Sequence, residues 1–313
     1  MPLTDKCISV LSPCYNEQGN AGALHDRVRI VMATLSDYSY EHLFIDNASR
    51  DGTAEELRAL AAGDPAVKVI LNNRNFGHVR SPYHGLLQAR GDAVIVMAAD
   101  LQDPPELIPE FIRLWEAGND VVLGQKINSA ESSFFFALRK CYYRMVKRLA
   151  DIDLLENVTG FGLYSRKVIE DLRALDEPYP YVRGLVSELG YKIARVPYEQ
   201  PQRQRGITKN NFYTLYDVAM LGITSHSKVP LRLATMLGFA ASALSFMVGL
   251  AYLVYKLVFW DRFALGVAPV VIGLFFFASV QLFFIGILGE YLGAIHTKVT
   301  KRPLVIERER INF

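Results

Sequence analysis

The stretch AVIVMAADLQDPPE, residues 93–106, decides how the first half of the chain folds. Its beginning, Ala93–Ala98, is uncharged and apolar, as in a strand buried inside a parallel sheet. Acidic and amide side chains follow at once in Asp100-Leu101-Gln102-Asp103, and Pro104-Pro105 marks a turn into a helix. The stretch therefore predicts a buried strand that delivers polar side chains to one edge of a sheet.

The same arrangement of an apolar run followed by a polar cluster recurs through residues 7–124. Apolar runs alternate there with amphipathic segments, as in a parallel sheet whose strands are joined by crossover helices. The expected strands are Cys7–Leu11, His42–Asp46, Val67–Leu71, Ala93–Ala98 and Asp120–Leu123, with a further one near Phe161–Tyr164. The polar clusters are Ser12–Glu17, Asp46–Ser49, Asn72–Asn75 and Asp100–Asp103. In open α/β sheets ligands bind at the carboxyl ends of the strands, so these clusters predict one shared site.

The apolar residues, 51% of the 313, are concentrated near the C-terminus. Leu233–Tyr255 contains 23 residues without a charge, and Phe263–Gly289 contains 27. Either run is long enough to cross a hydrocarbon core of roughly 30 Å as a helix. We expect two transmembrane helices, at about 233–257 and 264–289, joined by a short turn. A pair of buried core helices is the alternative.

Basic residues orient this hairpin. Five of them flank its outer ends, and the turn between the spans holds two, which one acidic residue partly offsets. The flanking residues are Lys228, Arg232, Lys298, Lys301 and Arg302, and those of the turn are Lys256, Arg262 and Asp261. Since basic residues are enriched on the cytoplasmic side, both outer ends are expected there. This predicts a multi-pass protein of the inner (cytoplasmic) membrane, with its large domain in the cytosol.

The expected organisation is a cytosolic domain over 1–229, two transmembrane helices within 230–295, and a cytosolic tail over 296–313. The first part includes juxtamembrane helices from about residue 207, which either lie on the membrane surface or pack against the domain. The N-terminus shows no pattern of a cleaved leader. Three scattered cysteines favour a reducing compartment, and the net charge of +2 says nothing about partners by itself. Nucleic-acid binding has no support, because the globular part lacks a basic stripe interleaved with aromatic residues.

The Asp100–Asp103 turn also suits a metal ion. Oxygen ligands such as those of Asp100 and Gln102 are preferred by Mg²⁺ and Mn²⁺, which complete their coordination with waters and substrate phosphates. Aspartate and proline are equally common in turns and helix caps, so a purely structural turn is the alternative.

Taken in order, four motifs resemble those of the family-two glycosyltransferases: Pro13–Glu17, Asp46–Thr53, Asn75-Phe76-Gly77 and Asp100–Asp103. Adding the basic loop Arg203–Lys209, Pro230-Leu231-Arg232 and the two spans narrows the resemblance to the polyprenyl-phosphate glycosyltransferases. That group includes dolichol-phosphate mannose synthases and the bactoprenol glucosyltransferases of O-antigen modification. The resemblance implies a GT-A-like, nucleotide-sugar-binding α/β fold with a mostly parallel sheet.

The resemblance also implies roles for residues. The donor nucleotide sugar would be held by Pro13, Tyr15, Glu17, Asp46, Asn47 and Asp100, and a Mg²⁺ or Mn²⁺ ion by Asp100 and Gln102. Asp103 would lie beside the sugar as a catalytic residue. Phosphates of the donor or acceptor would be bound by Arg203, Arg205 and Lys209, with Arg205 catalytic. A solvated basic turn near anionic lipid heads is the alternative for this loop.

The implied reaction is transfer of a hexose, with UDP-glucose favoured as donor, to a polyprenyl phosphate such as undecaprenyl phosphate, by an inverting single displacement. The acceptor phosphate is largely dianionic at pH 7, so it can attack without a general base. GDP-mannose and UDP-GlcNAc remain alternative donors. Relatives with two spans can form tetramers, which makes a homotetramer an expectation.

The chain departs from the family pattern at three places. Ala98 stands where the usual Asp-x-Asp has its first acidic residue, Asn47-Ala48 replaces Asp-Gly in Asp-Asp-Gly-Ser, and Gly160 replaces an acidic residue that some members carry. The second change concerns recognition of the base or ribose. Ala98 and Gly160 suggest an alternative function, a nucleotide-sugar-binding membrane scaffold or sensor without catalysis. A processive polysaccharide synthase is disfavoured, because neither Trp115 nor Trp260 follows a Gln-x-x-Arg-Trp motif.

Overall fold

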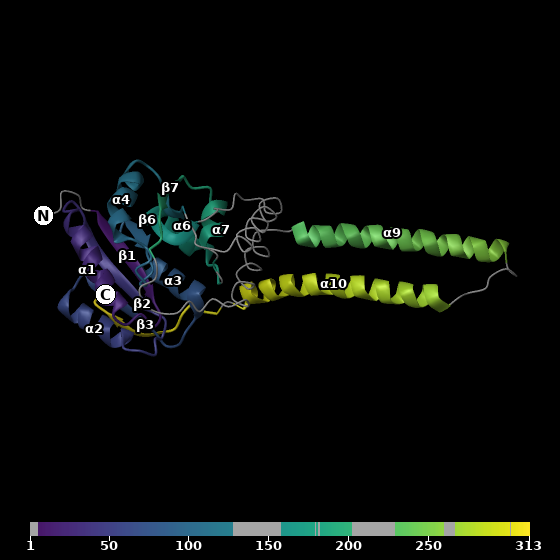
Figure 1. The fold of residues 1–313 in the computed structure, drawn as a ribbon, viewed down its shortest axis with the longest axis horizontal. Helices are drawn as coiled ribbons and strands as arrows, with labels where there is room; N and C mark the ends of the chain where they lie inside the picture. The colour runs from purple at the N-terminus through teal and green to yellow at the C-terminus, as the bar shows by residue number, and fades with distance from the viewer. Residues whose placement is uncertain are drawn as a thin grey trace.

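The computed structural model describes residues 6–127, 158–178, 180, 182–201, 229–259, 267–300 and 302–313. In these parts the chain forms an α/β domain and a long helical hairpin (Figure 1). One eight-stranded sheet organises the domain, in the order β7-β5-β6-β4-β1-β2-β3-β8. The strands are β1 (Cys7–Cys14), β2 (Ser39–Asp46), β3 (Val67–Asn72), β4 (Ala93–Val96), β5 (Val121–Lys126), β6 (Val158–Ser165), β7 (Ile193–Tyr198) and β8 (Glu307–Ile311).

All six expected strands are present in this sheet, and β7 and β8 are additional. The sheet is mostly parallel. Two of its strands run in the opposite direction: β6 is antiparallel to β4 and β5, and β8 is antiparallel to β3. β4 ends at Val96, two residues earlier than expected. The reason is local: the backbone N–H of Ala98 donates to the Asp103 carboxylate (2.9 Å), which starts a turn at this point.

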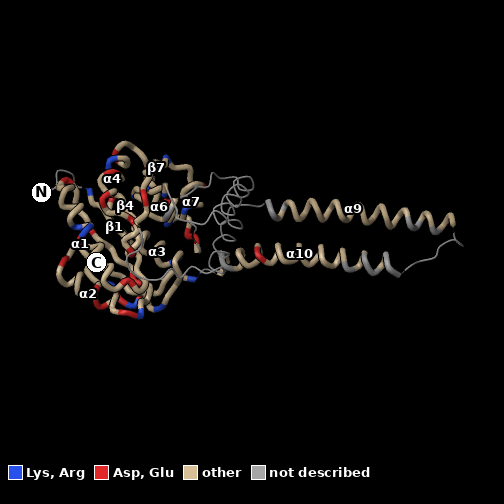
Figure 2. Tube along the Cα trace, viewed as in Figure 1, with Lys and Arg blue, Asp and Glu red and all other residues tan. Residues whose placement is uncertain are grey.

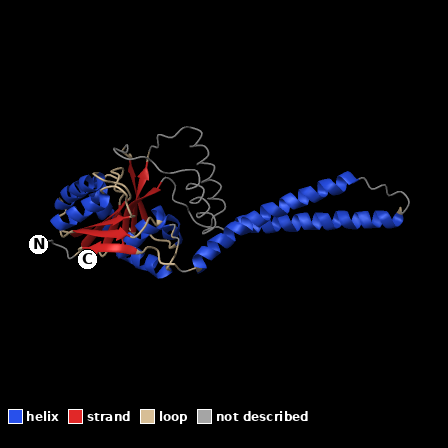
Figure 3. Cartoon of the chain, turned by 90° about the horizontal axis from the view of Figure 1, so that it is seen from below, coloured by secondary structure: helices blue, strands red, loops and turns tan. Residues whose placement is uncertain are grey.

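Helices cover both faces of the sheet, as Figure 3 shows. They are α1 (Asn20–Ala33), α2 (Thr53–Gly63), α3 (Gly77–Gln88), η1 (Pro105–Leu107), α4 (Ile108–Glu116), α6 (Arg166–Leu175) and α7 (Val182–Glu188). Side chains of α1, α2 and α4 pack with one face of the strands, and those of α3, α6 and α7 pack with the other. Strand residues alternate between these two cores: Ile8 and Val10 belong to the first, and Leu11 belongs to the second.

The hairpin consists of α9 (Val229–Val258) and α10 (Val267–Val299), which project together from the domain (Figure 1). Within them, 233–251 and 276–296 have mean hydropathies of 1.8 and 1.6, with no part of either buried inside the chain. Charged residues gather on the domain, whereas both helices are almost free of them (Figure 2). At a rise of about 1.5 Å per residue, each helix exceeds the roughly 30 Å of a hydrocarbon core. Both are thus long and apolar enough to span a membrane.

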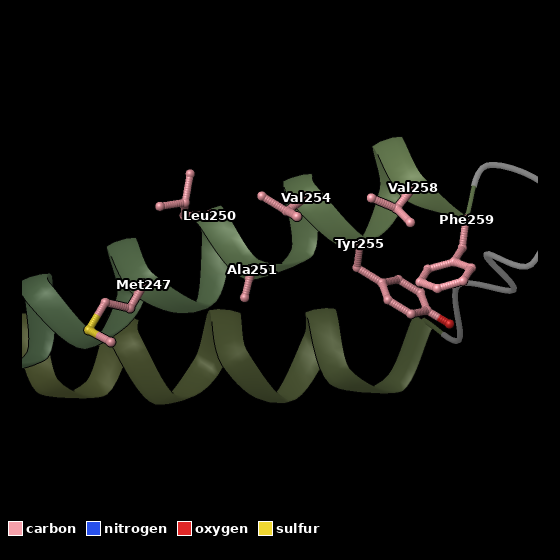
Figure 4. A pocket seen from close by; sticks show the side chains of 7 residues that line it. All are labelled: Met247, Leu250, Ala251, Val254, Tyr255, Val258 and Phe259. Carbon is pink, nitrogen blue, oxygen red and sulfur yellow. The ribbon is translucent and has the colours of Figure 1, made fainter.

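A shallow apolar groove lies on α9, towards the end of the hairpin far from the domain (Figure 4). Its lining residues are Met247, Leu250, Ala251, Val254, Tyr255, Val258 and Phe259. Ala251 and Tyr255 extend towards α10.

After α10 the chain returns to the domain and adds β8 to the free edge of β3. Its side chains anchor it to helices on both sides: Arg58 lies 2.8 Å from Glu309, and His84 lies 2.5 Å from Glu307. The Asn312 amide donates to the carbonyl oxygen of Val67 (2.9 Å). Both ends of the hairpin are therefore connected to the domain.

Candidate active site

Strand direction brings the polar clusters to one edge of the sheet. β1, β2, β3 and β4 are mutually parallel, and β5 and β7 run the same way because β6 is antiparallel to both β4 and β5. The register pairs Cys14 with Asp46, which places Pro13 and Tyr15 on either side of that pair. Because β8 is antiparallel to β3, its first residues, Glu307 and Arg308, also lie at this edge.

The loop after β2 is built around Asp46, whose side chain is buried. Its carboxylate accepts hydrogen bonds from the backbone N–H (3.1 Å) and the hydroxyl of Ser49. Burial raises the pKa of Asp46, and the Ser49 bonds and the Arg308 charge oppose that shift. Asn16 ties the loop after β1 to this loop, because its backbone N–H donates to Ser49 Oγ (2.8 Å). The two loops form one surface.

The predicted base- and ribose-binding residues are close to Asp46 but differ in exposure. Pro13 and Tyr15 are partly exposed, whereas Glu17 is buried. The Glu17 backbone N–H donates to Thr53 Oγ1 (2.9 Å), and its carboxylate accepts from the Asn20 amide (2.7 Å). Glu17 therefore also joins the first turn of α1 to the start of α2.

The Asn47 side chain forms hydrogen bonds within the protein that its position in the sequence motif does not predict. Its amide nitrogen donates to Asn75 Oδ1 (3.0 Å) and the Gly77 carbonyl (3.1 Å), and its oxygen accepts from the Phe76 N–H (2.9 Å) and the Asn72 amide (3.2 Å). An asparagine side chain has two donor hydrogens and two lone pairs, so these bonds use all of them. Asn47 holds the Asn-Phe-Gly loop against the end of β2.

The turn after β4 presents Asp100 and Gln102 at the same edge. Leu101 between them is buried and has φ 63°, a left-handed conformation that turns the backbone sharply. One Asp100 oxygen accepts the Gln102 N–H (3.2 Å). The Gln102 amide nitrogen donates to the carbonyl of Pro201 (3.3 Å), which leaves the amide oxygen directed elsewhere. Pro201 directly precedes the segment that holds the basic loop, so the chain enters that loop beside the Asp100 turn.

Asp103 is 7% exposed and closes this turn. One carboxylate oxygen accepts the Ala98 N–H (2.9 Å), and the other accepts the Tyr198 hydroxyl (3.2 Å). Burial raises the pKa of Asp103 to about 6, while both hydrogen bonds and the charge of Lys126 act in the opposite direction. Each oxygen retains a second lone pair that could accept a substrate hydroxyl.

Backbone strain is concentrated in these loops. Five residues other than glycine have positive φ in the described chain, and three of them, Asn16, Ala48 and Leu101, follow β1, β2 and β4. Such conformations cost of order 1 kcal/mol each and persist where the surroundings impose them, often at functional sites. The clustering is a separate observation that supports this edge as the candidate site.

The residues fit a divalent cation that binds substrate phosphates. Within the described residues no group of three His, Cys, Asp or Glu side chains could hold a metal unaided. Among the residues that the structure describes, Asp100 Oδ2 accepts no hydrogen bond, and Gln102, two residues later, bonds through its amide nitrogen and keeps its oxygen for a ligand. Mg²⁺ is commonly held by one or two carboxylates together with waters and phosphates, so this sparse donor set is sufficient.

The structure brings together Pro13, Tyr15, Glu17, Asp46 and the Asp100 turn. The basic residues Arg203, Arg205 and Lys209 lie outside the described residues, as do the expected juxtamembrane helices. Tyr198 and Arg308 were missed, because β7 (IARVPY) and β8 (ERERI) contain charged residues and lack the uninterrupted apolar runs by which the other strands were predicted.

Comparisons with known proteins identify the family of the chain. The model of Glycosyl transferase family 2 matches residues 9–173, and the model of the GtrB C-terminal hairpin matches residues 229–295. The chain is 36% identical over 299 residues to the uncharacterized glycosyltransferase YkcC of Bacillus subtilis (95% of this chain, 92% of that protein). It is 35% identical over 300 residues to the SfII prophage-derived bactoprenol glucosyl transferase of Shigella flexneri (96% of each).

Among solved structures, the chain is similar to glucosyl-3-phosphoglycerate synthase from Mycobacterium tuberculosis in complex with Mn²⁺, UDP-glucose and phosphoglyceric acid. That similarity has a TM-score of 0.48 at 19% identity and covers 70% of this chain and 78% of the other. The family matches and the near full-length identity to relatives are decisive. The chain belongs to glycosyl transferase family 2 and carries the GtrB C-terminal hairpin.

Proposed function

We propose that this protein transfers glucose from UDP-glucose to a polyprenyl phosphate at the cytosolic face of the inner membrane. The main observation in favour of the proposal is that both ends of an apolar hairpin connect to a family-two glycosyltransferase domain. A donor that is soluble and an acceptor whose phosphate lies at the lipid surface require a site held in this position. The relatives named bactoprenol glucosyl transferase match both the domain and the hairpin.

The proposed reaction is a single displacement with inversion. A phosphate oxygen of the acceptor attacks the anomeric carbon and forms the new C–O bond, while the bond from that carbon to the UDP oxygen breaks. No proton needs to be removed, because the acceptor phosphate is largely dianionic near pH 7. Alignment and charge neutralisation are then the main requirements.

This chain's residues have distinct parts in that scheme. Pro13, Tyr15 and Asp46 line the place for the base and ribose, and Asp103 accepts hydrogen bonds from the sugar. Asp100 and Gln102 would hold Mg²⁺ or Mn²⁺, which when bound neutralises charge on the leaving diphosphate. The contact between Gln102 and Pro201 supports a role for the loop that follows, including Arg203, Arg205 and Lys209, on the phosphates.

The scaffold or sensor remains the second candidate, because of Ala98. Its backbone, rather than its side chain, makes the contact that closes the Asp103 turn. Replacement of an acidic residue at this position therefore leaves the turn intact, and Asp100 remains available as a carboxylate ligand. This favours an enzyme over a protein that only binds the nucleotide sugar.

The test uses the full chain purified in detergent, with undecaprenyl phosphate, Mn²⁺ or Mg²⁺, and radiolabelled UDP-glucose, GDP-mannose or UDP-GlcNAc in parallel. We expect label in the lipid fraction with UDP-glucose and at least a tenfold loss in Asp100→Ala. Nucleotide binding without transfer would establish the sensor, and transfer from another donor would correct the sugar. Light scattering of the detergent-solubilised protein would test the homotetramer, which could cover part of the exposed surface of α9 and α10.

A further inference from the structure

A β-bulge at the start of β8 makes one arginine an extra residue of the sheet, at the edge where the donor site is proposed. Leu71 pairs with Glu309, but the next residue, Asn72, pairs with Glu307, so Arg308 is an extra residue in the ladder. Bulges of this kind bend a strand locally and redirect a side chain, and they are frequent beside active sites. This one lies at the carboxyl end of β3, where the site is.

The contacts of the neighbouring side chains confirm the local turn of the strand. In a regular strand, residues 307 and 309 would share one face. Here Glu309 contacts Arg58 of α2, and Glu307 contacts His84 of α3, although these helices cover opposite faces of the sheet. The bulge therefore separates two anchored carboxylates and leaves Arg308 between them.

Arg308 differs from its neighbours in having no ion-pair partner in the part of the chain that the structure describes. Glu307, Glu309 and Arg310 all form ion pairs, whereas the Arg308 guanidinium makes no hydrogen bond or ion pair with any residue that the structure describes. It is exposed, and it lies at the same edge of the sheet as the buried carboxylate of Asp46, because Asp46 pairs with Leu71 and Leu71 pairs with Glu309. An unpaired guanidinium beside a nucleotide-binding carboxylate has all of its donors available for a ligand.

We propose that Arg308 is a donor-binding residue whose guanidinium donates hydrogen bonds to acceptor oxygens of the nucleoside diphosphate held beside Asp46. The proposal rests on the proposed function and adds a residue that lies beyond the membrane hairpin. Its consequence is that the donor site is complete only when the chain after α10 has returned to the sheet. Donor binding is thereby coupled to the correct seating of the membrane anchor.

The experiment measures binding of UDP, UMP and uridine to the full chain in detergent with Mn²⁺, by calorimetry. Arg308→Ala should weaken UDP binding about tenfold, as expected for loss of a hydrogen bond to a charged group at a partly solvated site. Arg308→Lys, which keeps the charge but not the fork of donors, should fall between. The matched control is Arg195→Ala on β7, another exposed arginine on the opposite edge strand, which should bind UDP within twofold of wild type.

The ligand series locates the contact. If Arg308→Ala weakens the binding of UDP but not of uridine, Arg308 contacts the phosphates. If it weakens the binding of both ligands, Arg308 contacts the base or ribose. Either result supports the proposal. UDP affinity within twofold of wild type in Arg308→Ala would overturn it, as would a rise in KM for the lipid acceptor alone. If wild type itself bound no UDP, the proposed function would fail instead. Unfolding midpoints of the variants should match wild type, because the Arg308 side chain forms no hydrogen bond or ion pair with the residues that the structure describes.

Discussion

Replacing Tyr198 by phenylalanine should move the acidic limb of the activity profile towards neutral pH. Tyr198 donates a hydrogen bond to the Asp103 carboxylate, and this bond favours the ionised form. Burial already raises the pKa of Asp103 to about 6. Removing this bond removes one of the interactions that lower the pKa of Asp103, so that pKa should rise further. If Asp103 must be ionised to accept hydrogen bonds from the sugar, activity will be lost at a higher pH.

The size of the shift follows from the geometry. The donor–acceptor distance is 3.2 Å, which is long for a bond to a carboxylate. A bond at the weak end of the usual range contributes about 1.5 kcal/mol, or about one pKa unit. The half-maximal point of the acidic limb should therefore lie near pH 6 in wild type and about one unit higher in Tyr198→Phe.

The assay is transfer of labelled glucose to undecaprenyl phosphate, with kcat/KM for the donor measured between pH 5 and 8.5. The acceptor phosphate also titrates near pH 6, but it does so identically with both enzymes. The difference between the profiles therefore isolates the protein group.

Tyr191→Phe is the matched control. That hydroxyl also donates to a carboxylate, Asp171, but Tyr191 comes just before the first residue of β7, at the edge of the sheet opposite the site, so its loss should leave the limb unchanged. Superimposable limbs for wild type and Tyr198→Phe would refute the reasoning, since they would show that Asp103 ionisation does not control the reaction.

Three further results are expected. Ala48→Gly should preserve or raise the unfolding midpoint. Ala48 has φ 59°, and glycine removes a left-handed backbone strain of roughly 1–2 kcal/mol, which the greater entropy of glycine in the unfolded chain only partly offsets. The control Ala59→Gly, within α2, should lower the free energy of unfolding by about 1 kcal/mol. Asp100→Asn should abolish the gain in UDP affinity that Mn²⁺ confers on wild type, and chelation should remove it from wild type alone; an unchanged gain in the variant would exclude Asp100 as a ligand. Burial lowers the pKa of His42 well below 6.5, so the unfolded chain takes up the proton first. Folding stability should be fully present above pH 6.5 and decline below it by up to about 1.4 kcal/mol per pH unit, with a shallower decline in His42→Gln measured by thermal melts.

Much of the fold could be predicted because its signals are local. Ala93–Ala98 and the other parallel strands are apolar runs that end in turn residues, and each forms close to its expected position. The ends of β1, β2 and β4 converge for a topological reason, since parallel strands with crossover helices must finish at one edge. The apolar spans were equally evident, because a membrane-crossing helix requires an uninterrupted length of uncharged sequence.

Side-chain roles were less predictable, because they depend on partners distant in the sequence. Asn47 occupies a motif position that suggests ligand contact, yet its amide is fully bonded to the loop around Asn75 and Gly77. Asp103 was recognised as important, but its link to Tyr198 joins residues 95 positions apart. No periodicity in the chain reports such a pair.

Strand propensity, turn chemistry and hydrophobic length act between near neighbours, so the parallel sheet, the edge expected to hold the site and the two apolar helices could be predicted from local residue patterns. Residues 307–311 are charged and have no apolar pattern, and their pairing as an edge strand beside β3 depends on contacts that form only in the folded chain. That pairing is stabilised by backbone hydrogen bonds and by ion pairs to α2 and α3, none of which exists until the chain has passed through the hairpin and returned. The position of Arg308 at the donor site is a consequence of that long-range closure.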